Sequence, residues 1–226
     1  MKKLFLPLLF AVAIPVTFSC NSSRLASYML TQGDAGMAIR QMLELGSKEN
    51  LTGAFSKEQV LSTIFPQQVS KALNTLNMLG LTTEVDRFTT TLSTAAEKTA
   101  TASVPIFVNS ISKLSFSDAI RIIKNGGTSA TDYLRSSAGD TLRRSISPVM
   151  QATIAEYKLT DQWNKIMKPV QAITGNKVNV DLANLMAGLV AEAMFRKIAE
   201  KEVEVRMQAA ARTTPLLQKV FSRSWN

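Results

Sequence analysis

The chain has 226 residues, 46% of them hydrophobic, and a formal net charge of +9. This length and apolar content are enough for a folded domain with its own core, and they exclude a disordered chain. There is no histidine and only one cysteine, Cys20. Histidine triads, histidine metal sites and, apart from Cys20, thiolate chemistry are therefore excluded. We expect no metal or other cofactor.

The N-terminus has the pattern of a secretory signal. Lys2 and Lys3 give it a short basic start, and residues 4–18 carry no charge. That run is shorter than the roughly 20 apolar residues that span a bilayer, and small residues lie at its end. Residues 1–19 are therefore predicted to be a signal peptide that directs export.

The single cysteine stands directly after the predicted cleavage point. Ser19 followed by Cys20 resembles the signal of bacterial lipoproteins, in which the cysteine becomes the mature N-terminus and carries acyl chains. A lone cysteine cannot form an internal disulfide, and more than one acyl chain gives stable anchoring. We expect lipidation of Cys20, a lipidated N-terminus and tether over residues 20–32, and one domain over residues 33–226.

Helical periodicity begins near Ala35 and has its first stop near Gly46. Pro66 suits the first turn of a following helix. A longer helix comes next, with Thr83 as its predicted cap and Pro105 as a predicted kink or break.

The second half of the chain shows the same period. A short helix opens at residues 117–118 and closes at residues 125–127, and the next begins at residue 128 or 129 and is bent or ended by Pro148. Residues 160–161 cap another helix, which Pro169 is predicted to stop. Residues 175–180 look extended. Asp181 opens the last long helix, and Thr213 or Thr214 caps a final turn.

No alternating strand pattern of useful length occurs, and no internal repeat or low-complexity linker is apparent. The fold is therefore predicted to be all-α, a single irregular helical bundle of about seven to nine helices after the N-terminal signal segment.

Three segments together carry a resemblance to a known family: AAEKTATASVPIFVNSISKLSFSDAIRIIKNG, TDYLRSSAGDTLRRSISPVM and AARTTPLLQKVF. In order and spacing they resemble domain of unknown function 4197, a family of exported bacterial proteins. The resemblance runs from about the first helix to Phe221. It implies a shared helical fold and an envelope location, and it carries over no catalytic residue.

Arg212, in the last of these segments, is a candidate binding residue. Its guanidinium group can hold a carboxylate or phosphate through two parallel hydrogen bonds. The alternative is structural. Adjacent alanines let the last long helix end close to a neighbour, and Arg212 pairs with an acid at the edge of the core.

Asp118, Tyr133 and Arg135 are further candidates. Asp118 lies in a helix first turn, where an acid is stabilising in any case. Tyr133 and Arg135 are candidates to line a groove. The alternative is that Tyr133 packs with its hydroxyl at the edge and Arg135 pairs with Asp132.

Arg143 and Arg144 follow Asp140 by three and four residues, so both are predicted to have a local partner. Together with Arg135 they are candidates for a basic face that binds lipid headgroups.

Two acid-first pairs spaced four residues apart occur in the last long helix. They are Glu192 with Arg196 and Glu202 with Arg206. Such pairs are typical of a solvated helix surface.

These features favour a non-enzymatic exported lipoprotein of the bacterial cell envelope, anchored at Cys20 and facing the periplasm. Its role is predicted to be the binding of a protein or an amphiphilic ligand, and not of nucleic acid. Two alternatives stay open. One is an envelope hydrolase or lyase that uses carboxylates and arginine, and the other is an anionic-lipid-binding protein, whose binding would weaken with salt.

Overall fold

The computed structural model describes residues 30–64, 74–174 and 181–222, and the structural statements below concern these ranges. The predicted signal segment, Cys20, Pro66 and the extended-looking residues 175–180 lie outside them. Within the described ranges the chain is all-α and contains no strand, as predicted. The helices are α1 (Gln32–Ser47), α2 (Lys57–Ile64), α4 (Thr82–Lys113), α5 (Ala119–Asn125), α6 (Ser129–Glu156), α7 (Leu159–Thr174), α8 (Leu182–Met207) and α9 (Pro215–Phe221), with a 3₁₀ turn η1 (Ala209–Ala211) before α9.

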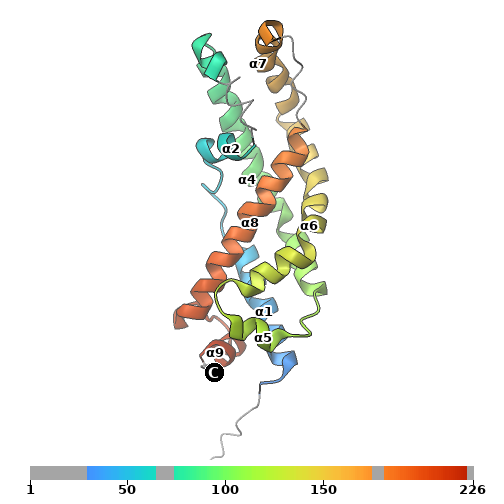
Figure 1. The fold of residues 1–226 in the computed structure, drawn as a ribbon, viewed down its shortest axis with the longest axis vertical. Coiled ribbons are helices and arrows are strands. Elements are labelled where there is room, and N and C mark those ends of the chain that lie inside the picture. Colours follow the sequence, from blue (N-terminus) through green and yellow to red (C-terminus); the bar gives the residue numbers. More distant parts are fainter. Residues whose placement is uncertain (1–29, 65–73, 175–180, 223–226) are drawn as a thin grey trace, which may run out of the picture.

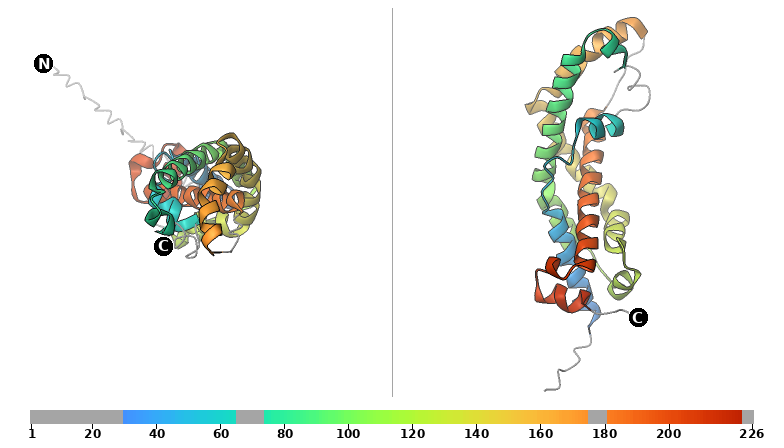
Figure 2. Two further views of the ribbon diagram at one scale, coloured as in Figure 1. Left: turned by 90° about the horizontal axis from the view of Figure 1, so that it is seen from above. Right: turned by 90° about the vertical axis from the view of Figure 1, so that its left-hand side faces the viewer.

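The helices form an elongated bundle (Figures 1 and 2). The long helices α4, α6 and α8 run along its length, with α6 packed on both α4 and α8, and with α1 packed on α8. At one end, called the basal end below, α1 begins beside α5 and α9. The opposite end holds α7 and the start of α4 (Figure 1). None of the described helices is both long enough and apolar enough to cross a bilayer.

Several helix starts follow from local side-chain chemistry. Asp181 caps α8 by accepting a hydrogen bond from the Asn184 N–H at 3.0 Å, as predicted. Thr214 likewise caps α9. The predicted cap at Thr83 is wrong, because α4 begins at Thr82 and no side chain caps it. Its first turn lies at the exposed end of the bundle, where water can bind the free N–H groups.

The first helix begins slightly earlier than the periodicity near Ala35 predicts. The Thr31 hydroxyl accepts from the Asp34 N–H at 3.0 Å, and the Asp34 carboxylate accepts from the Thr31 N–H at 3.2 Å. This reciprocal pair is a capping box, which satisfies two backbone donors at once. Gln32, the last residue of the predicted tether, is therefore the first residue of α1.

The prediction that Pro169 stops its helix is wrong, and Pro105 and Pro148 do not break or end theirs, so for these two the predicted kink or bend is the alternative left open. Pro105, Pro148 and Pro169 lie inside α4, α6 and α7, which continue past them. Pro105 and Pro148 are exposed, so the carbonyl groups that they leave unbonded can be hydrated. The cost of an internal proline, about 3 kcal/mol, is offset by burial of the residues that follow. In α4 these include Phe107 and Ile111, both fully buried.

One contiguous core runs through the bundle. The rings of Phe107 on α4 and Phe195 on α8 meet with centroids 5.4 Å apart. Helices α1 and α8 approach each other closely at Gly46, where a Cβ atom would lie 2.7 Å from the Cα of Ile198. Only glycine lets the two backbones approach so closely.

Candidate functional site

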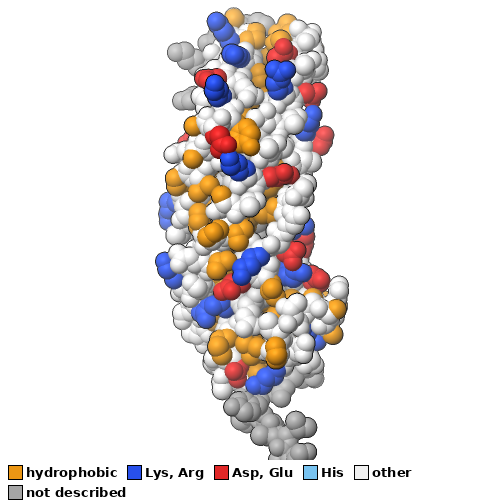
Figure 3. Space-filling view, turned by 180° about the vertical axis from the view of Figure 1, so that it is seen from behind, with side chains coloured by type: hydrophobic (Ala, Val, Ile, Leu, Met, Phe, Trp, Pro, Cys, Tyr) orange, Lys and Arg blue, Asp and Glu red, His pale blue; other side chains and the backbone are white. Residues whose placement is uncertain are grey.

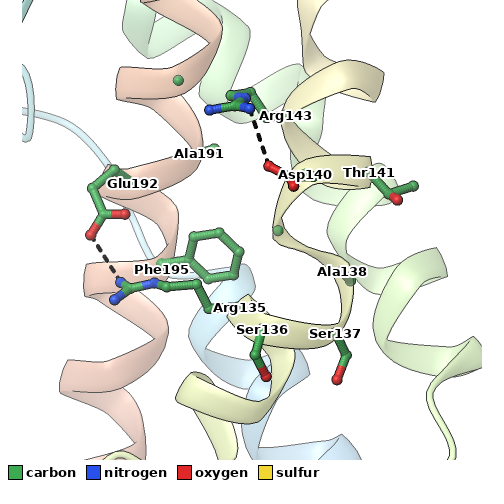
Figure 4. Close-up of a pocket in the computed structure, with 12 residues that line it drawn as sticks. Arg135, Ser136, Ser137, Ala138, Asp140, Thr141, Arg143, Ala191, Glu192 and Phe195 are labelled. Atoms are coloured by element: carbon green, nitrogen blue, oxygen red, sulfur yellow. Dashed lines mark hydrogen bonds and ion pairs between the residues drawn. The ribbon is translucent and has the colours of Figure 1, made fainter.

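A hollow of about 370 Å³ opens between α6 and α8 (Figure 4). We call it the α6–α8 hollow. It is defined by Arg135, Gly139, Asp140 and Arg143 of α6 and by Gly188, Glu192 and Phe195 of α8.

Two glycines and one ring shape this hollow. A Cβ atom on Gly139 would lie 3.7 Å from the Cγ of Arg135 and 3.9 Å from the ring of Phe195. A Cβ atom on Gly188 would lie 3.7 Å from the Cδ of Arg143. These are ordinary contact distances, so the glycines leave open space instead of relieving a clash. Phe195 is buried and provides an apolar floor.

Arg135 crosses the hollow from one helix to the other. Its Nη2 donates to Glu192 Oε1 at 2.9 Å, and its guanidinium carbon lies 5.1 Å from the centroid of the Phe195 ring. The predicted pairing with Asp132 is wrong, since Asp132 accepts from the Thr128 hydroxyl at 3.0 Å. The Phe195 ring attracts the guanidinium group of Arg135, and Glu192 lies on α8 beside that ring. Arg135 therefore pairs with Glu192 on the neighbouring helix.

The other two candidate arginines, Arg143 and Arg144, contact residues of their own helix. Arg143 Nη2 donates to Asp140 Oδ1 at 3.1 Å, as predicted. Arg144 does not share this carboxylate, and its Nη2 lies 3.4 Å from the hydroxyl oxygen of Thr141. Arg135 and Arg143 are therefore each neutralised by an acid, and the surface is less basic than the sequence suggests. Each of these two arginines keeps further N–H donors that these bonds leave available.

Asp118 and Tyr133 lie outside the hollow. Asp118 precedes α5 and forms an ion pair with Arg121. The Tyr133 hydroxyl donates to the Ser115 carbonyl at 2.6 Å, and its ring packs on Phe116 with centroids 5.5 Å apart. This agrees with the structural alternative for Tyr133.

Arg212 is also structural, but in a way that differs from both interpretations of the sequence. Its Nε donates to the Val205 carbonyl and its Nη2 to the Arg206 carbonyl, each at 2.9 Å. The expected pairing with an acid is wrong, because the last carbonyl groups of α8 have no partner within their own helix and the guanidinium fork fits them.

The largest departure from expectation is at Glu202, which is fully buried instead of solvated. Its carboxylate accepts from the N–H groups of Ala130 and Thr131, at 3.0 and 2.8 Å, and from the Thr131 hydroxyl at 2.6 Å. A side chain of α8 thus caps the first turn of α6, where the helix dipole favours a negative charge.

Arg206 completes this arrangement. Its Nε and Nη2 donate to Glu202 Oε1 at 3.0 and 2.7 Å, and its Nη1 donates to the Ile123 carbonyl in the last turn of α5 at 2.9 Å. Its Nη2 also lies 3.2 Å from the Ser129 hydroxyl oxygen, and its guanidinium packs 5.4 Å from the Phe221 ring centroid. We call this pair the Glu202–Arg206 staple, since it joins the end of α5 and the start of α6 to α8.

The sequence contains one signal that Glu202 is buried. Position 202 continues the series of buried residues Val190, Met194 and Ile198, which lie four apart. The spacing of Glu202 and Arg206 by four, which is equally typical of an exposed ion pair, masked that signal.

Over the described ranges, no three acidic side chains come together in a way that could hold a metal ion. A family model, DUF4197, described as a protein of unknown function, matches residues 29–222. The chain belongs to the DUF4197 family. The match includes the three segments that carry the resemblance. No curated protein and no solved structure matches the chain.

Within this DUF4197 domain the two charged clusters differ in what they can do. The Glu202–Arg206 staple is buried, and its carboxylate is satisfied by protein donors. The α6–α8 hollow is open to solvent, and its arginines have donors to spare. Of the two clusters, the hollow is the one able to accept a ligand.

Proposed function

We propose that this DUF4197 protein is a lipid-anchored protein of the bacterial cell envelope that faces the periplasm and acts by binding. The observation that carries the proposal is the position of Cys20, directly after a signal-like segment. Leu30, the first described residue, follows only ten positions later, and α1 begins at Gln32. An anchor on Cys20 would therefore hold the folded body close to a membrane.

The α6–α8 hollow is the proposed binding site. Arg135 and Arg143 are held in place by their acids and can offer further donors to a bound carboxylate or phosphate group. The Phe195 ring gives apolar contact beside them. This combination fits a small amphiphilic ligand with an acidic group, because it offers donors and an apolar surface within one space.

The alternative of an envelope hydrolase or lyase needs two carboxylates that take different protonation states. Asp140 and Glu192 are the acids that line the hollow, and an arginine binds each of them. Each acid that lines the hollow is therefore already engaged in an ion pair. This arrangement supports binding over acid–base catalysis.

The anchor is tested by growing cells with a labelled fatty acid. The wild-type protein is expected to take up the label and to fractionate with membranes, whereas the Cys20→Ser variant takes up none. Absence of label from the wild-type protein, or a full-length product left in the cytosol, would refute the anchor.

The hollow is tested by native mass spectrometry of the mature protein extracted from membranes. We expect a small acidic molecule to accompany the wild-type protein and to be lost from the Arg135→Gln variant. Arg121→Gln is the matched control, because Arg121 is also an exposed, ion-paired arginine but lies on α5. If the Arg135→Gln variant retains the molecule at the wild-type level, the assignment of the hollow is wrong.

A further inference from the structure

The start of the folded body is fixed at the basal end. Lys219 of α9 lies 3.8 Å from the Asp34 carboxylate in the first turn of α1, and the Thr214 hydroxyl donates to Gln41 of α1 at 2.8 Å. Ten residues from Cys20 to Leu30 can span at most about 35 Å. By comparison, α4 has 32 residues and is about 48 Å long. A protein anchored at Cys20 therefore keeps its basal end, and not its opposite end, near the bilayer.

The basal end presents an apolar segment to solvent where α8 stops. Met207 is 77% exposed, and Ala209, Ala210 and Pro215 are exposed after it. Arg212 holds the end of α8 through two backbone carbonyls, so this segment is tied to the helix end. Exposed apolar residues on a well-bonded turn are suited to contact with the headgroup region of a membrane.

Two lysines stand at the same end. Lys113 ends α4 and Lys124 lies in the last turn of α5, and both are exposed. The α5 end is joined to the end of α8 by the bond from Arg206 to the Ile123 carbonyl, which places Lys124 near the apolar segment. We define the basal surface as these two lysines together with the four apolar residues Met207, Ala209, Ala210 and Pro215.

Several cations along the bundle are paired with acids, as in Lys98–Glu156, Arg135–Glu192 and Lys197–Glu200, although others, such as Lys165 of α7, form no ion pair within the described residues. On the face drawn in Figure 3, basic and acidic side chains lie next to one another along much of the length. Within the described residues, no ion pair involves Lys113 or Lys124. The basal surface thus combines apolar contact with unneutralised positive charge.

We propose that the basal surface rests on an anionic lipid bilayer, with Met207 among the headgroups and Lys113 and Lys124 at the lipid phosphates. The inference rests on the proposed anchor at Cys20 and adds an orientation to it. The long axis then points away from the membrane, and the α6–α8 hollow is displaced from the lipid surface. Each lysine near an anionic surface strengthens association about fivefold.

The test uses the mature, lipidated protein in vesicles of phosphatidylethanolamine and phosphatidylglycerol. An environment-sensitive fluorophore is attached to a cysteine at Met207→Cys or, as the matched control, at Met78→Cys. Met78 is 87% exposed and lies four residues before α4, whose start is at the opposite end of the bundle (Figure 1). Acylation blocks the sulfur of Cys20, so each variant carries one label. Lipids with a nitroxide headgroup should quench the label at position 207 several-fold more than the label at position 78.

Three outcomes decide between the claims. Equal quenching at the two positions, in protein that floats with the vesicles, overturns the orientation and leaves the anchor standing. Protein that does not float contradicts the proposed anchor and with it this inference. Phosphatidylcholine in place of phosphatidylglycerol, or the double change Lys113→Gln and Lys124→Gln, should reduce quenching at position 207. Unchanged quenching under both conditions overturns the role of the lysines.

Discussion

Replacing Glu202 by alanine is expected to lower the free energy of unfolding by about 3–5 kcal/mol. The change removes a carboxylate that is fully buried and that accepts hydrogen bonds from two backbone N–H groups, one hydroxyl and Arg206. Arg206, only 10% exposed, would keep its positive charge without its acid. Loss of one partner of such a pair costs more than the pair itself contributes, because the remaining charge stays buried.

The size of the effect can be checked against its parts. The cap of a helix start contributes about 1 kcal/mol, and an unsatisfied buried donor costs about 1–3 kcal/mol. Together these two terms give about 2–4 kcal/mol, which overlaps the 3–5 kcal/mol expected for breaking a buried pair. A domain of this size has a total stability of about 5–15 kcal/mol, and each kcal/mol shifts its melting temperature by about 2–4 °C. The Glu202→Ala variant should therefore melt roughly 6–20 °C below the wild type.

The assay is urea and thermal unfolding followed by circular dichroism. Glu200→Ala is the matched control, because Glu200 is exposed on the same helix and pairs with Lys197 at the surface. This control should change stability by less than about 1 kcal/mol. Glu202→Gln should fall between the two, since an amide keeps the shape but has one acceptor oxygen for several donors. Equal stability of Glu202→Ala and Glu200→Ala would refute the assignment of a buried cap.

Two further predictions concern packing and pH. Gly46→Ala should destabilise the fold by about 1–3 kcal/mol, because its Cβ atom would lie 2.7 Å from the α8 backbone, whereas Gly139→Ala should stabilise it by about 0.5–1 kcal/mol. Chemical denaturation of both variants tests this, and a loss at position 139 equal to that at position 46 would contradict it. Hydrogen bonds to Glu204 and Glu49 raise the pKa of Lys201 above its ordinary value of 10.5. The stabilisation of the fold by Lys201 is therefore complete below pH 10.5 and is lost as the pH rises through the raised pKa. The difference in free energy of unfolding between the wild type and Lys201→Met should then be constant near neutral pH and should shrink above pH 10.5. A difference that persists in strong alkali would be evidence against the ionic contribution.

Capping residues and a glycine stop correctly predicted several helix ends. Asp181 and Thr214 cap their helices through backbone bonds three residues away, and Gly126, with a φ of 68°, ends α5. These features depend on neighbours in the sequence, so they can be recognised without a tertiary structure.

Two of the errors share a physical cause, which is that a tertiary partner replaced the expected local contact. Arg135 binds Glu192 on another helix instead of Asp132 on its own, and Glu202 bonds to the start of α6. The prolines are a related case, since burial on either side of Pro105 outweighs its local preference to break the helix. The register of α6 against α8 sets these partners, and a single sequence does not show it. The Thr31–Asp34 capping box, by contrast, was a local signal that could have been recognised.

The Glu202–Arg206 staple and the ion pairs of the α6–α8 hollow contribute differently to the stability of the fold. The staple fixes the ends of α5 and α6, while the ion pairs of the hollow lie at the surface, where such pairs contribute little to stability. Substitutions in the hollow can therefore accumulate without unfolding the bundle. The same bundle can therefore carry a hollow with a different lining, provided that the staple is retained.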